Sequence, residues 1–153
     1  EVARAAGVDA YEVCPEAVVQ AELNAARTAG ARLVMHGTSA YPELLAKLDD
    51  APPFLWVVGD PSLLKQRMVA LVGARNASSL GTRMARKLAH DLGHAGYVIV
   101  SGLARGVDAA AHDAALDTGT IAVQAGGVDV MDPAENTELA HFLRFSRSKT
   151  TRK

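Results

Sequence analysis

A strand, a glycine turn, a polar loop and a helix follow one another between residues 68 and 95, and this order constrains the fold more than any other feature. An aliphatic run over residues 68–72 ends at Gly73, the loop after it carries Arg75, and an amphipathic pattern begins at Ser79. In such a unit, free backbone N–H groups and the positive end of the helix dipole face whatever lies beyond the strand. A guanidinium in the same loop adds a planar donor suited to phosphate oxygens. The unit therefore predicts an anion-binding loop.

Two familiar phosphate signatures are excluded by spacing. The dinucleotide fingerprint needs three glycines in a G-x-G-x-x-G arrangement, whereas this loop holds only Gly73 and Gly81. The ATP-binding loop needs a Gly-Lys pair followed by Ser or Thr, and that tripeptide is absent from the chain. By itself, the motif is equally consistent with a tight glycine turn and a surface arginine.

A second loop repeats this chemistry. Residues 97–100 form another buried-strand pattern, and the loop after them leads into an alanine-rich helix over residues 109–116. Asp108 is expected to cap that helix. The loop itself supplies Ser101, Gly102, Arg105 and Gly106.

Strand and helix patterns alternate along the chain, which predicts an α/β fold with a parallel sheet and helices on both faces. The expected strands are residues 32–35, 54–58, 68–72, 97–100 and 120–125. The expected helices are residues 15–29, 41–48, 79–95 and 109–116. Loops that follow successive parallel strands emerge at the same edge, so Arg75 and Arg105 are expected to face one crevice.

The helix over residues 79–95 has a regular apolar stripe, which is expected to be its buried face. The stripe consists of Leu80, Met84, Leu88 and Leu92, with Ala85 and Ala89 beside them. His90 and His94 lie opposite it, four residues apart as in a two-histidine metal face, but no third ligand is placed by the sequence. No metal is therefore expected. His112 is expected to be a packed, hydrogen-bonded histidine.

Composition indicates a globular chain with one modest core: 153 residues, 49% hydrophobic and 22% charged. Its net charge is −1, but residues 1–143 hold 11 basic and 17 acidic residues, net −6, because five cations lie in the last ten positions. A nucleic-acid binder with such a body must concentrate its positive potential locally. Cys14 is the only cysteine, which favours a cytoplasmic location. No apolar run approaches the ~20 residues of a membrane span.

Several motifs together resemble the DNA-processing protein A family (DprA, also called Smf). They are, in chain order, Tyr41–Leu45, Pro53–Asp60, Val72–Gly81, Val100–His112 and Ala125–Asn136. The resemblance runs from about residue 41 to about residue 139, and the Ser-Gly-Leu-Ala-Arg-Gly-Val-Asp block is its most specific part.

The resemblance implies a Rossmann-like domain that binds single-stranded DNA. It implies a binding protein and not an enzyme, and no cofactor is expected. It also implies a homodimer that helps to load a RecA-type recombinase onto incoming strands during natural transformation, in the cytoplasm. Carried over by position, Arg75 is the main phosphate contact, with Gly73 and Ser78 letting the backbone approach. The neighbouring wall is formed by Ser101, Gly102, Arg105 and Gly106. Donors without base-edge readers fit sequence-tolerant binding to a nucleic-acid backbone.

The chain departs from the family near its C-terminus. Asp132 stands where a tyrosine is usual, and the family domain continues well beyond Asn136. We divide the chain into a helical segment and linker (1–36), the first part of the Rossmann-like domain (37–141) and a basic tail (142–153).

The sheet is therefore expected to be incomplete at its C-terminal side. A parallel sheet is normally buried on both faces, with its outer strands covered. Leu103 and Val123 are predicted to remain partly exposed. Residues 142–153 are predicted to be poorly ordered, because no apolar periodicity docks them.

An enzymatic alternative remains open. Rossmann-like phosphoribohydrolases of the lysine-decarboxylase-like type also place glycine loops and arginines around a nucleotide phosphate. They need a Pro-Gly-Gly-x-Gly-Thr turn and a catalytic glutamate. Here the turn reads Ala125-Gly-Gly-Val-Asp129, and Glu135 is the first glutamate after it.

Overall fold

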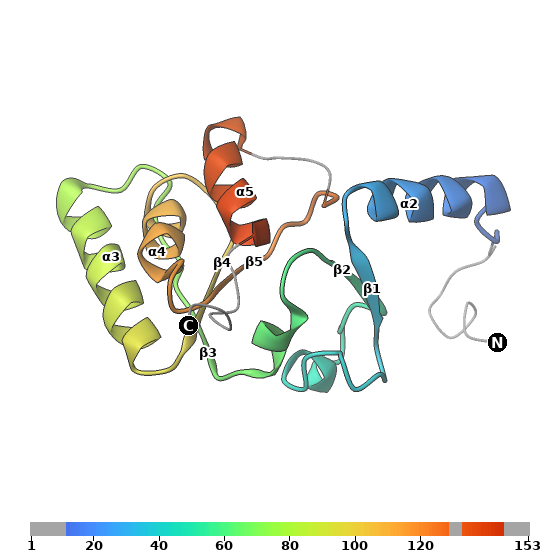
Figure 1. Ribbon diagram of the computed structural model, residues 1–153, viewed down its shortest axis with the longest axis horizontal. Coiled ribbons are helices and arrows are strands. Elements are labelled where there is room, and N and C mark those ends of the chain that lie inside the picture. Colours follow the sequence, from blue (N-terminus) through green and yellow to red (C-terminus); the bar gives the residue numbers. More distant parts are fainter. Residues whose placement is uncertain (1–11, 129–132, 146–153) are drawn as a thin grey trace, which may run out of the picture.

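The computed structural model describes residues 12–128 and 133–145, and confirms the predicted α/β class with a parallel sheet flanked by helices. Figure 1 shows α2 (Glu16–Thr28) and the strand pair β1–β2 at one end of the long axis, with α3 (Ser79–His94) at the other. The remaining elements are β1 (Arg32–Met35), η1 (Leu45–Lys47), β2 (Phe54–Val57), η2 (Pro61–Lys65), β3 (Met68–Ala70), β4 (Val98–Ser101), α4 (Val107–Ala115), β5 (Thr120–Ala122), η3 (Ala134–Asn136) and α5 (Thr137–Phe145).

The strands form two sheets rather than the one parallel sheet that alternation predicted. β1 and β2 pair with each other in antiparallel fashion, from Arg32 opposite Val57 to Met35 opposite Phe54. The long connection between them folds back on itself, because the buried Tyr41 donates its hydroxyl to the carbonyl of Pro52 at 2.7 Å. This closure returns the chain beside β1, so β1 and β2 form a unit of their own. The helix expected over residues 41–48 shortens to η1.

The parallel sheet has the strand order β3–β4–β5, with α3 and α4 as its crossovers. Met68 lies opposite Val98, and Ile99 opposite Thr120. Two right-handed crossovers in one direction place both helices on the same face, where α3 and α4 pack against each other and against β4. The carboxyl ends of the three strands then open onto one edge of the sheet.

The core between α3, α4 and the sheet is built from small residues around one large one. Ile99 is fully buried among Ala89, Ala111 and Ala115. Gly93 faces Thr118 so closely that a Cβ there would overlap the Thr118 side chain. Small side chains at these positions let the two helices approach each other and the strand.

The predicted burial of the α3 stripe is wrong for three of its four residues. Leu80, Met84 and Leu88 are 63%, 53% and 45% exposed, whereas Leu92 packs against the core. The buried face of α3 is formed by Ala85 and Ala89, which were predicted to lie beside the stripe, together with Gly93. Arg86 pairs with Asp113 of α4, so at 3.6 residues per turn the apolar stripe lies on the flank turned away from α4.

The N-terminal elements follow the sequence closely. α2 begins after Pro15 and ends before Gly30, whose φ of 71° suits glycine. Trp56 of β2 donates its indole N–H to Glu22 of α2 at 2.9 Å, which ties the helix to the antiparallel pair. None of the helices in the described ranges is long and apolar enough to span a bilayer.

Helix α5 was not predicted, and the expected tail boundary at residue 142 falls inside it. Leu139 and Leu143 share one face at a four-residue step, and Ala140 is buried. Arg144 also donates to the carbonyl of Val128. Residues 142–145 therefore belong to a helix that packs against β5, while the rest of the expected tail, 146–153, lies outside the described residues, as does Asp132.

Candidate nucleic-acid interface

Two loops meet at the carboxyl edge of the parallel sheet: the β3–α3 loop (residues 71–78) and the β4–α4 loop (residues 102–106). The backbone N–H of Val107 donates to the carbonyl of Ala74 at 3.2 Å. Gly106, with φ of 80°, faces the same carbonyl so closely that a Cβ would overlap it. A Cβ at Gly73 would lie 2.7 Å from Cγ2 of Val107. Both glycines therefore have a structural reason to be small, since they let the two loops pack together.

Arg75 is exposed on the first of these loops, and its guanidinium has no hydrogen bond or ion pair among the described residues. The loop leads into α3, whose N-cap is Ser78. The Ser78 hydroxyl oxygen accepts from the N–H of Gly81 at 3.2 Å, as a capping serine does. The N–H groups of Ser79 and Leu80 have no partner within the helix. A fixed positive charge thus lies next to an open, positive helix end.

The N-terminus of α4 differs from that of α3, because a carboxylate occupies it. The prediction that Asp108 caps the helix is wrong in position: Gly106 is the N-cap, and Asp108 is the second helical residue. The buried Asp108 accepts hydrogen bonds from the N–H groups of Gly102 at 3.2 Å and Ala104 at 3.3 Å. These donors are therefore already used within the fold. At the helix end itself, Val107 and Ala109 donate their N–H groups to the carbonyls of Ala74 and Ala104, so the N-terminus of α3 is the more open of the two.

Ser101 and Leu103 are buried beneath this edge instead of lining it. Ser101 is 3% exposed and donates its hydroxyl to the carbonyl of Leu71 at 2.6 Å, which joins β4 to the end of β3. Leu103 is 2% exposed and has a φ of 63°, so its predicted exposure is wrong. Its carbonyl accepts from the side-chain amide of Asn136 at 2.8 Å, which fixes η3 against the loop. Val123, by contrast, is 60% exposed, as predicted.

Arg105 is exposed on the second loop and forms an ion pair, with 3.5 Å between its Nη1 and Oε1 of Glu135. Glu135 is the glutamate that the hydrolase alternative requires, and it lies in η3. The sequence did not predict that Glu135 and Asn136 contact the second loop. The Pro-Ala-Glu-Asn motif around them was the available signal, but nothing in it placed η3 beside residues 102–106.

His112 is a packed histidine, as predicted, and lies under the second loop. Its Nδ1 is 2.7 Å from Oγ1 of Thr120, which in turn donates to the carbonyl of Ile99 at 2.8 Å. The imidazole must therefore be the donor to Thr120. Burial lowers the pKa of His112 to about 4, even though the nearby Asp108 carboxylate acts to raise it. The ring is thus neutral at physiological pH.

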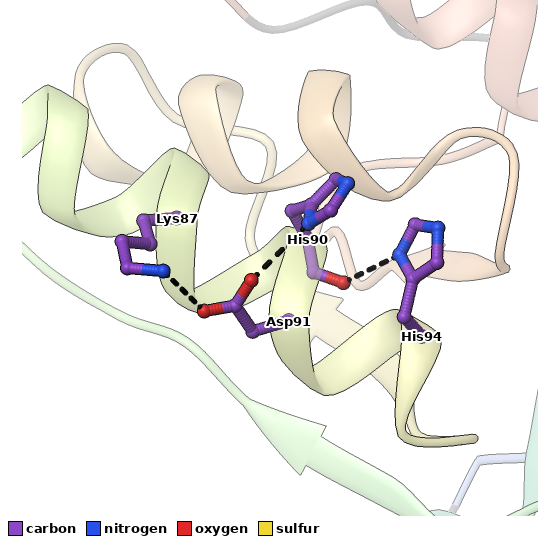
Figure 2. A network of polar contacts seen from close by, with 4 residues as sticks. All are labelled: Lys87, His90, Asp91 and His94. Carbon is purple, nitrogen blue, oxygen red and sulfur yellow. Dashed lines mark hydrogen bonds and ion pairs between the residues drawn. The ribbon is translucent and has the colours of Figure 1, made fainter.

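His90 and His94 do not form a metal site with other residues of the described ranges. Figure 2 shows how their Nδ1 atoms are used within α3: His90 contacts Asp91 at 3.2 Å, and His94 contacts the carbonyl of His90 at 2.8 Å. Lys87 completes the group by pairing with Asp91 at 2.7 Å. Hydrogen bonds from Lys87, which has the larger effect, and from His90 lower the pKa of Asp91. The group is a solvated network on the outer face of the helix.

Comparison with known proteins identifies relatives that match most of the chain, including both loops. The family model for DNA recombination-mediator protein A matches residues 32–148, which includes part of the expected tail. The DNA processing protein DprA of Streptococcus pneumoniae is 44% identical over 105 residues, and that of Bacillus subtilis is 37% identical over 124 residues. These matches cover 67% and 79% of this chain but 37% and 42% of the relatives. The chain therefore spans about two fifths of the length of these curated relatives.

Two solved structures share the fold. The X-ray structure of DprA from Streptococcus pneumoniae superposes with a TM-score of 0.75 at 36% identity, over 86% of this chain and 45% of that one. A structure of DNA processing protein A from Helicobacter pylori, described in terms of its single-stranded-DNA binding mode, gives a TM-score of 0.67 at 30% identity. It covers 76% of this chain and 53% of that one.

Proposed function

We propose that this chain, which belongs to the DNA recombination-mediator protein A family, holds the phosphate backbone of single-stranded DNA at the carboxyl edge of its parallel sheet. The observation that carries the proposal is the state of Arg75. It is an exposed guanidinium without a partner among the described residues, next to the open N-terminus of α3. Charge and backbone donors at this position suit a phosphate group.

Several features favour a single strand recognised through its backbone. The two loops offer arginines, and the first loop leads into the open N–H groups of α3; such donors bind phosphates without reading base edges. The Helicobacter pylori relative of similar fold is described as binding single-stranded DNA. The acidic balance of residues 1–143, net −6, is compatible with a positive potential concentrated at this edge.

The wider role follows from the family. We infer that the protein acts in DNA processing during natural transformation, in the cytoplasm, as a homodimer that passes single strands to a RecA-type recombinase. The described edge supplies the DNA contact in this scheme. Gly73, Gly102 and Gly106 shape the loops, while Arg75 and Arg105 contact the strand.

We also infer that the protein binds DNA without catalysing a chemical reaction on it. Glu135, the carboxylate needed for nucleotide hydrolysis, forms an ion pair with Arg105. Incubation with nucleoside monophosphates is expected to release no free base. Release that disappears in Glu135→Gln would favour the hydrolase.

Replacement of Arg75 tests the proposal directly. Arg75→Ala is expected to weaken binding to oligo-dT by ~1–3 kcal/mol, the value of a charge-assisted contact. Fluorescence anisotropy at fixed salt measures the affinity. Lys65→Ala is the matched control, because it removes an exposed cation from η2, at the amino end of β3. Equal affinities for Arg75→Ala and Lys65→Ala would overturn the proposal.

A further inference from the structure

We propose that Glu135 is a specificity-determining residue that lowers the affinity of this edge for isolated phosphate groups by occupying Arg105. The inference rests on the proposed function, since it concerns the same DNA-binding surface. It assigns different tasks to the two arginines. Arg75 is available at all times, whereas Arg105 becomes available only when a ligand displaces Glu135.

The ion pair is placed where a ligand can break it. Nη1 of Arg105 lies 3.5 Å from Oε1 of Glu135, and the two side chains are 58% and 63% exposed. An exposed pair of this kind contributes ~0.2–1 kcal/mol, so a phosphate oxygen can compete with the carboxylate for the guanidinium. The carboxylate also repels the phosphate until it moves away.

The backbone around Glu135 is held in place, so the pair does not depend on a chance encounter of two long side chains. The adjacent Asn136 donates its side-chain amide to the carbonyl of Leu103 at 2.8 Å. Leu103 is buried two residues before Arg105, on the same loop. This contact anchors η3 against the β4–α4 loop and keeps Glu135 within reach of Arg105.

Discrimination between ligands follows from this arrangement. A mononucleotide that reaches Arg105 gains one contact, but the Arg105–Glu135 ion pair is lost when it binds. A DNA strand already held at Arg75 presents further phosphates at high local concentration, so the same loss is offset more easily. Glu135 therefore favours a strand over single phosphates.

Charge-neutralising variants test the inference in the intact chain. Glu135→Gln is expected to raise the affinity for a short oligo-dT about two- to fivefold at low salt, as the energy of an exposed pair implies. The gain for thymidine monophosphate is expected to be proportionally larger than for the oligonucleotide. Glu43→Gln is the matched control, because it removes an exposed carboxylate from the segment between β1 and β2.

A double-mutant cycle separates release of Arg105 from a general change of charge. In an Arg105→Ala background, Glu135→Gln is expected to lose most of its effect, and thermal unfolding should show that each variant remains folded. The same gain with and without Arg105, or the same gain in Glu43→Gln, would overturn the inference. Binding that depends on Arg75 but is unchanged by Glu135→Gln would refute this inference alone. Absence of oligo-dT binding by the unmodified protein would refute the proposed function as well.

Discussion

Acidification is expected to destabilise this protein through the buried imidazole of His112. The ring is fully buried, with Nδ1 bonded to Thr120, and Nε2 has no hydrogen-bond partner among the described residues. Burial lowers the pKa of His112 from its ordinary value of 6.5 to about 4. Between these two values the unfolded chain binds a proton that the folded chain excludes. Stability must therefore fall as the pH decreases from about 6.5 to about 4.

The size of the effect follows from the two pKa values. Each unit of difference corresponds to about 1.4 kcal/mol, so the lowered pKa of His112 implies a loss of about 3 kcal/mol across this pH range. That loss is a large part of the stability of a small domain. The Asp108 carboxylate opposes the effect of burial, and the pKa of about 4 already includes its contribution.

The variant His112→Asn isolates this contribution. Asparagine retains an N–H donor for Thr120 but does not titrate. Its stability at pH 7 is expected to be lower, because the smaller side chain leaves a cavity. Its dependence on pH should nevertheless be flatter by about 3 kcal/mol between pH 6.5 and 4. Urea unfolding followed by circular dichroism at several pH values measures both curves, and parallel curves would refute the reasoning.

Three other substitutions probe the packing around the site. Gly106→Ala is expected to cost about 2–4 kcal/mol, because it combines a positive φ with overlap on the Ala74 carbonyl; an unchanged melting temperature would refute this packing. Asp108→Ala leaves the N–H groups of Gly102 and Ala104 without their acceptor, at a cost of about 1–3 kcal/mol in denaturant unfolding, and Asp108→Asn should recover part of it. Met84→Lys should change the free energy of unfolding by less than ~0.5 kcal/mol, because Met84 is exposed. It should also reduce self-association in sedimentation velocity, because it interrupts an exposed apolar stripe. A loss of stability of several kcal/mol would show that Met84 is buried in solution.

The order of elements around the site could be predicted from the sequence because each strand is a short apolar run closed by glycine. The predicted strands and helices from Met68 to Ala122 differ from the observed ones by at most three residues at either end. The crossover rule then fixes the edge on which Arg75 and Arg105 lie. The loops themselves are adjacent, as the hydrogen bond from Val107 to Ala74 shows.

The errors concern choices that the sequence pattern does not encode. The apolar sector of α3 is wider than one contact face, and close packing on Ala85, Ala89 and Gly93 decides which part is buried. The pairing of β1 with β2 depends on how the long connection between them closes.

Asp108 and Glu135 illustrate the same limit at the candidate site. Nothing in local sequence indicates that Asp108 accepts from the loop preceding its helix rather than capping it, or that Glu135 meets an arginine 30 positions earlier. Both contacts depend on the tertiary arrangement of η3, α4 and the second loop.

Hydrogen exchange read by mass spectrometry, with and without saturating oligo-dT, locates the DNA on the protein and so tests the central claim most directly. We predict slower exchange in the bound state over residues 73–81 and 102–106, which form the two loops and the start of α3, with no change in α2, β1 or β2. Full binding with unchanged exchange over residues 73–81, and protection confined to the N-terminal elements, would contradict the claim.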